Sequence, residues 1–157
     1  MEVVTYGPGS VTNSGGLIVS ALRVDRPPVT DCFALRFETG GSSVVFSADT
    51  CDFPPLAEFA TGADILVHEA MLTAGVDKLA ARTPGADRLR EHLMASHTPA
   101  DDVGRIASEA LAGRLVLNHL VPADDPDFSE ADWTTEVSKT WNGPVIIGRD
   151  GLVIPIP

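Results

Sequence analysis

Four short motifs in this sequence carry the carboxylate and imidazole side chains that bind metal ions or transfer protons. They are Ser47-Ala48-Asp49-Thr50, His68-Glu69-Ala70, Ser96-His97-Thr98 and Leu117-Asn118-His119-Leu120. Three of them end short apolar runs, which are typical of buried strands, and the Ser-His-Thr motif precedes a predicted helix. In open α/β sheets the functional site lies beyond the carboxyl ends of the strands. We therefore predict that these side chains meet at one edge of a sheet.

Aspartate and histidine at strand ends are suitable ligands for zinc, iron or manganese, and a carboxylate can bridge two such ions. Asp49 and His119 are the first candidates for a metal site because each follows an apolar run directly. His68 ends the remaining run and is a further candidate ligand. Two structural alternatives stay open, with Asp49 as a turn-stabilising carboxylate and His119 as a hydrogen-bonded core histidine.

His97 and Glu69 have the residue types of an acid–base pair. His97 lies just before the start of a predicted helix, where the positive end of the helix dipole lowers the basicity of an imidazole. Glu69 is a candidate to hold a ring nitrogen of His97, although a glutamate there can also serve as a helix N-terminal charge. Since a catalytic zinc usually takes about three protein ligands, the residues alone predict an incomplete metal site.

The elements that must position these residues alternate between strands and helices after a β-rich first third. Hydrophobic periodicity and turn residues predict strands over 17–24, 32–37, 43–47, 65–67 and 115–117, helices over 54–60 and 98–112 and from 129, and a closing hairpin of 144–147 with 152–154. In the long helix Thr98 is the predicted N-cap, and Pro99 the first helical residue. This order predicts an α/β fold.

Length and composition limit the classes of protein to which the chain can belong. A length of 157 residues with 44% hydrophobic and 21% charged residues fits one globular domain. No apolar run approaches the ~18 residues of a membrane span, and the acidic start over 1–3 is unlike a secretory signal. We therefore expect a cytoplasmic protein without a membrane partner. Cys32 and Cys51 lack metal-type spacing and are interpreted as free thiols, with Cys51 a remaining soft-ligand alternative near Asp49.

The net charge of −11 is evidence about partners. Binding to a phosphate backbone depends on lysine and arginine, and an acidic surface opposes it. The small basic segment that includes Lys78 and Arg82 is interleaved with acids such as Asp77, which predicts a solvated, ion-paired face. We therefore expect nucleic acid to be disfavoured and a small ester-type molecule to be the substrate of any hydrolytic activity.

Taken together, in this order and spacing, the four motifs resemble the C-terminal half of the metallo-β-lactamase superfamily, in its arylsulfatase-like and tRNase-Z-like branch. The resemblance runs from about Leu17 to the C-terminus. It implies half of an αββα sandwich, a mixed sheet with helices on one face, over a single domain of 1–157. It further implies that Asp49 bridges two metal ions, zinc or else iron or manganese, and that His119 completes one shell. Glu69 and His97 would then form the acid–base pair of an ester or phosphoester hydrolase.

Two departures from the family pattern change this expectation. The hallmark His-x-His-x-Asp-His cluster is absent, because none of the four histidines forms a His-x-His pair. Arg26 stands where a further ligand histidine is expected, and a guanidinium does not bind metal. Ala48 also replaces the usual glycine. The resemblance therefore implies a hydrolase that is inactive or incomplete as this chain alone.

Three explanations of this incompleteness remain open. The missing ligands can come from another segment or chain, or the sequence can be a truncation of an ordinary enzyme. Alternatively, the protein is a shortened, non-catalytic homologue that acts through binding or self-association. Half of a two-sheet sandwich leaves one sheet face open, which predicts a homo-oligomer or a hetero-partner that covers this face.

Overall fold

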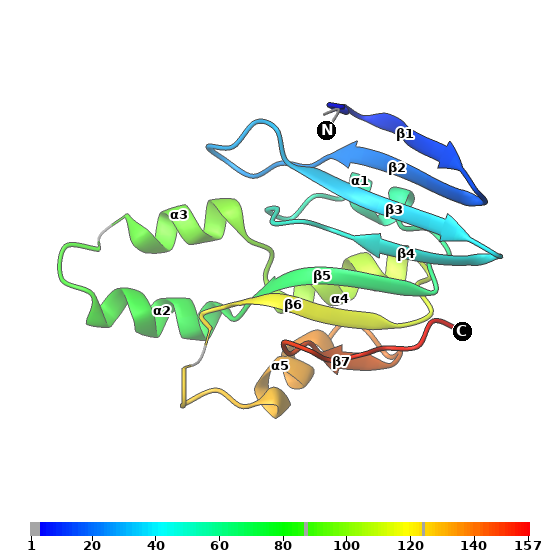
Figure 1. Ribbon diagram of the computed structural model, residues 1–157. Helices are drawn as coiled ribbons and strands as arrows, with labels where there is room; N and C mark the ends of the chain where they lie inside the picture. Colours follow the sequence, from blue (N-terminus) through cyan, green and yellow to red (C-terminus); the bar gives the residue numbers. More distant parts are fainter. Residues whose placement is uncertain (1–3, 87, 124) are drawn as a thin grey trace.

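The seven strands of the sheet lie side by side in the order in which they follow one another along the chain (Figure 1). The computed structural model describes residues 4–86, 88–123 and 125–157, so the acidic start over 1–3 lies outside the described residues. The strands are β1 (Gly9–Ser14), β2 (Leu17–Arg23), β3 (Phe33–Thr39), β4 (Ser42–Phe46), β5 (Ile65–Met71), β6 (Leu115–Val121) and β7 (Val145–Ile147). The first three pairings are antiparallel and the last three are parallel. The sheet is therefore mixed, as predicted.

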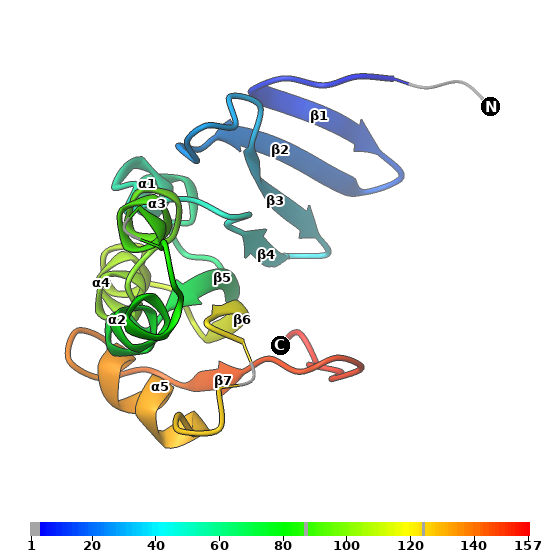
Figure 2. The same ribbon diagram turned by 90° about the vertical axis from the view of Figure 1, so that its left-hand side faces the viewer.

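The helices cover one face of this sheet and leave the other face open (Figure 2). They are α1 (Pro55–Phe59), α2 (Thr73–Arg82), α3 (Leu89–Ser96), α4 (Ala100–Glu109) and α5 (Glu130–Val137). Parallel strands need crossover connections, and such connections are almost always right-handed. Because β4 to β7 advance across the sheet in one direction, right-handed crossovers place all of these helices on the same side. The predicted α/β class with helices on one face is confirmed.

The hydrophobic core lies between the helices and the covered sheet face. Along β5, Leu66 and Ala70 belong to this core and are fully buried. Their neighbour Val67 is only partly buried and lines the open face, since successive strand residues point to opposite faces. The same alternation on β4 buries Val45 and leaves Phe46 exposed. The pattern fixes which face each functional side chain of β5 and β6 can reach.

The prediction of a closing hairpin is wrong. Strand β7 pairs in parallel with β6, and the segment 152–154 forms no strand. After the turn at Gly151 this segment crosses the open face, where the hydroxyl of Ser42 donates to the Pro157 carbonyl at 2.9 Å. Its apolar side chains form one wall of a trough of about 590 Å³ on that face. The trough is lined by Val44, Phe46, Val67, Val116, Leu152 and Ile154, among others.

The long helix begins one residue later than the sequence predicts. Pro99 is the N-cap of α4, and Thr98 precedes the helix. The Thr98 hydroxyl donates to the Thr50 carbonyl at 2.8 Å, so it joins two loops and does not cap the helix. Within the described residues, none of the helices combines the length and the apolar character that crossing a bilayer requires.

Candidate metal and acid–base site

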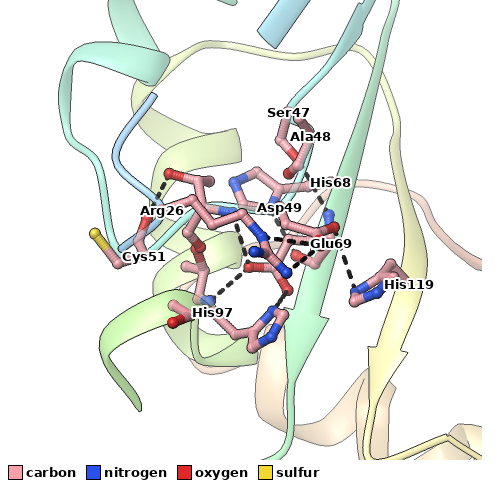
Figure 3. Close-up of polar contacts among 12 residues, drawn as sticks. Arg26, Ser47, Ala48, Asp49, Cys51, His68, Glu69, His97 and His119 are labelled. Atoms are coloured by element: carbon pink, nitrogen blue, oxygen red, sulfur yellow. Dashed lines mark hydrogen bonds and ion pairs between the residues drawn. The ribbon is translucent and has the colours of Figure 1, made fainter. Parts of the chain in front are cut away.

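Four of the predicted site residues come together at the carboxyl-terminal edge of β4, β5 and β6 (Figure 3). Asp49 follows β4, Glu69 lies in β5 and His119 lies in β6. His97 comes from the connection between α3 and α4. Because parallel strands end at the same edge of a sheet, three of these positions converge through the strand order alone. The position of His97 depends instead on how the chain returns to the sheet after α2 and α3.

The two oxygens of the Asp49 carboxylate face different partners. Its Oδ1 lies 3.4 Å from Nδ1 of His119. Its Oδ2 accepts from the guanidinium of Arg26, with Nε at 3.1 Å and Nη2 at 3.0 Å. The Arg26 and Asp49 side chains are each about a quarter exposed, at 26%. The family pattern indicated that Arg26 stands where a ligand histidine is expected, whereas its direct pairing with Asp49 appears only in the structure.

His119 reaches the site because β6 carries a bulge at this residue. Asn118 pairs with Glu69 and Leu120 pairs with Ala70, so His119 is skipped in the register. Its backbone is left-handed, with φ of 41°. A bulge re-aims a side chain out of the regular pleat, and bulges are frequent beside functional sites. The ring of His119 is thereby half-exposed and stacks on the His97 ring at 5.4 Å between centroids.

Glu69 lies in contact with His97 and also anchors the two loops around the site. Its side chain is 1% exposed, and its Oε2 lies 3.3 Å from Nδ1 of His97. Its Oε1 accepts from the backbone N–H of Thr98 at 2.8 Å and of Thr50 at 3.4 Å. One loop leads to His97 and the other carries Asp49. With Nδ1 directed at Glu69, Nε2 is the His97 atom left to face a ligand.

His68 lies apart from this group. Its neighbours of the same strand face, Leu66 and Ala70, belong to the core under the helices, whereas Glu69 points the other way. Nδ1 of His68 lies 2.6 Å from the Glu69 carbonyl oxygen, and its buried Nε2 has no hydrogen-bond partner in the described part of the chain. Burial lowers the pKa of the His68 imidazole. This position separates His68 from the metal-ligand candidates.

The two cysteines are free thiols that lie near the β4 exit but outside the ligand group. The Cys32 thiol donates to the Asp49 carbonyl oxygen at 3.3 Å, while the Cys51 thiol is directed at the Asp52 carbonyl at 3.7 Å. Desolvation by burial raises the pKa of both thiols. Neither thiol belongs to the ligand group formed by Asp49, His97 and His119 among the described residues.

The donor set fits one metal ion. One ligand atom each from Asp49, His97 and His119 lies within 4.8 Å of the others, among the described residues. A carboxylate with two imidazoles is a donor set suited to zinc and, less selectively, to iron or manganese. Three protein ligands with an open position are what a catalytic zinc site requires. The fixed positive charge of Arg26 beside Asp49 opposes a second cation.

Ala48 stores strain directly before Asp49, where it adopts a left-handed φ of 57°. A side chain in this region costs roughly 1–2 kcal/mol, while glycine adopts it freely. We expect Ala48→Gly to raise the free energy of unfolding by about 1 kcal/mol in urea denaturation. The control is Ala95→Gly in α3, which should lower it by a similar amount because its backbone is helical. A loss of stability in Ala48→Gly would contradict the strain.

The fold and the site together define a protein of the metallo-β-lactamase fold. No family model matches the chain. The chain is 29% identical to ribonuclease Z of Mycobacterium tuberculosis (strain ATCC 25618 / H37Rv), over 96% of its own length and 52% of the relative. It is 30% identical to the probable metallo-hydrolase YhfI of Bacillus subtilis (strain 168), over 96% of its own length and 53% of the relative.

Solved structures agree with these sequence relatives. The crystal structure of the metallo-β-lactamase fold protein YhfI from Bacillus subtilis matches with a TM-score of 0.69 and 28% identity, over 95% of this chain and 54% of that one. Human tRNase Z, short form, shares the fold with a TM-score of 0.61 and 20% identity, over 94% of this chain and 46% of that one. The chain is thus related to ribonuclease Z-like and YhfI-like proteins of this fold, and it spans about half the length of the curated relatives it matches.

These relatives overturn one sequence-based expectation. The net charge predicted that nucleic acid is disfavoured as a partner, and the similarity to ribonuclease Z contradicts this prediction. The prediction failed because net charge sums over the whole chain. Recognition of a phosphodiester at a metal and imidazole site is instead local, and it does not require a basic surface everywhere.

Proposed function

We propose that this chain provides part of the active site of a metal-dependent phosphodiester hydrolase, with RNA as the substrate class. The observation that carries the proposal is the convergence of Asp49, His97 and His119, with donor atoms within 4.8 Å, at the carboxyl ends of parallel strands. The similarity to ribonuclease Z supports a phosphodiester substrate over other esters. A metal ion held there would act as a Lewis acid toward a phosphoryl oxygen.

In this proposal the acid–base work falls to the Glu69–His97 pair. Oε2 of Glu69 faces Nδ1 of His97 and can accept a hydrogen bond from an N–H there. This contact orients the ring and favours the tautomer with the proton on Nδ1. Protonation of Nε2 then gives an imidazolium whose charge the buried carboxylate stabilises. Nε2 can hold this proton and donate it to the leaving oxygen of the ester. Asp49 and His119 serve as metal ligands.

We further propose that the site of this chain is incomplete by itself. The sequence lacks a His-x-His pair, so the donors that the family places on that motif must come from another polypeptide segment. Zinc-loaded protein should then hydrolyse bis(p-nitrophenyl) phosphate and a 3′-extended RNA no faster than its Asp49→Ala variant does. Asp49-dependent turnover by this chain alone would contradict incompleteness.

Metal analysis of the purified protein tests the site. Mass spectrometry of the metals should find stoichiometric zinc, iron or manganese, which is lost in Asp49→Ala and in His119→Ala. The matched control is His92→Ala, because His92 is exposed in α3 and lies outside the ligand group. Protein that is free of metal after incubation with each of the three ions would refute the proposal.

The open sheet face favours a second candidate function, that of a shortened homologue that acts through binding or self-association. Phe46 on this face is 43% exposed, which is high for a large apolar side chain. Light scattering after size exclusion should show an oligomer that Phe46→Asp dissociates. A monomer at tens of micromolar would count against this candidate.

A further inference from the structure

Arg26 lies in the connection between β2 and β3, where both its backbone and its guanidinium have hydrogen-bond partners. Its carbonyl accepts from the N–H of Val29 at 2.7 Å, which closes a tight turn directly after it. Its guanidinium directs two nitrogens at a single acceptor, Oδ2 of Asp49, at 3.1 and 3.0 Å (Figure 3). The two side chains are only about a quarter exposed, so water screens the pair less than it screens a surface ion pair. The guanidinium is therefore a fixed cation on one side of the carboxylate.

The opposite side of the carboxylate faces the imidazoles. Oδ1 of Asp49 lies 3.4 Å from Nδ1 of His119, whose ring stacks on His97. The carboxylate thus has one oxygen engaged by a permanent positive charge and one oxygen directed at an imidazole nitrogen of His119. A guanidinium keeps its proton under all physiological conditions and does not bind metal. A divalent cation can share Oδ1 with the His119 imidazole, but at Oδ2 it would meet the charge of Arg26 within a few ångströms.

We infer that Arg26 occupies a cation position at Asp49, so that Asp49 and His119 hold one divalent metal ion on the Oδ1 side of the carboxylate and the guanidinium lowers its affinity. The inference rests on the proposed metal site and adds the residue that sets its affinity. Arg26 also neutralises Asp49 before any ion binds. The single ion consequently binds against a fixed positive charge, and its affinity is lower than the donor set alone would give.

Zinc titration of the full chain tests this inference. Isothermal titration calorimetry, with equilibrium dialysis and metal mass spectrometry, should give one zinc per chain after subtraction of binding to Asp49→Ala. Arg26→Gln keeps a donor toward Oδ2 but removes the charge, so it should still bind one zinc, about tenfold more tightly. The matched control is Arg26→Lys, which keeps the charge and should bind zinc with an affinity near that of the wild type. Circular dichroism confirms that each variant is folded.

The possible failures are distinguishable. Two Asp49-dependent zinc ions in the wild type would overturn the inference and leave the proposed hydrolase site intact. Binding in Arg26→Gln that is equal to or weaker than in the wild type would also overturn it, since the guanidinium would then only position the carboxylate. Absence of any Asp49-dependent zinc would overturn both the inference and the proposed site.

Discussion

Glu69→Ala is expected to lower the free energy of unfolding by about 3–5 kcal/mol, the largest effect among single substitutions around the site. The variant leaves the backbone N–H groups of Thr50 and Thr98 without their buried acceptor and removes the partner of His97. Each unsatisfied buried donor costs roughly 1–3 kcal/mol. Because Glu69 joins the loops that carry Asp49 and His97, zinc affinity should fall as well. Urea denaturation and zinc titration measure the two effects.

Glu91→Ala serves as the control, because Glu91 is exposed in α3 and the same carboxylate is lost there without burial. Its free energy of unfolding should stay within about 0.5 kcal/mol of the wild type. If Glu69→Ala does not fold, Glu69→Gln gives the graded comparison. Its amide retains an acceptor oxygen but loses the charge, so about 1–3 kcal/mol should be lost. A Glu69→Gln variant as stable as the wild type would show that the carboxylate does not anchor the loops.

His68 is expected to make the protein less stable in mild acid. The imidazole of an unfolded chain titrates near its ordinary pKa of 6.5, and burial lowers the pKa of His68 in the folded protein. Below pH 6.5 the unfolded chain therefore binds a proton that the folded chain does not. The free energy of unfolding falls by roughly 1.4 kcal/mol per pH unit from this group until the folded pKa is reached. Above pH 6.5 the contribution disappears.

The comparison variant is His68→Asn, whose side-chain amide can still donate to the Glu69 carbonyl in place of Nδ1. Urea denaturation of both proteins at pH 7.5, 6.5 and 5.5 separates His68 from the other titrating groups, which are common to both. Between pH 6.5 and 5.5 the wild type should lose about 1 kcal/mol more than the variant, because the unfolded imidazole is only half protonated at pH 6.5. Parallel pH profiles would show that the buried imidazole accepts its proton without cost.

The parallel part of the sheet was predictable because its signals are local. Apolar runs ending in Asp49, His68-Glu69 and Asn118-His119 mark strands whose carboxyl ends share an edge, and turn and capping residues predicted α1, α4 and α5. Helices α2 and α3 were not predicted from the sequence. The closing hairpin was mispredicted because 152–154 has a strand-like composition. In the folded protein this segment covers apolar side chains of the open face and does not pair with β7.

The sequence by itself determined the α/β class, the residue types of the site and the absence of a His-x-His motif. Only the tertiary structure decided how these residues are aimed. The bulge that turns His119 toward His97, the placement of Glu69 and His68 on opposite faces, and the seating of Arg26 on Asp49 all depend on strand register and on a distant loop. Register is set by packing across the whole sheet, so no local pattern of residues contains it.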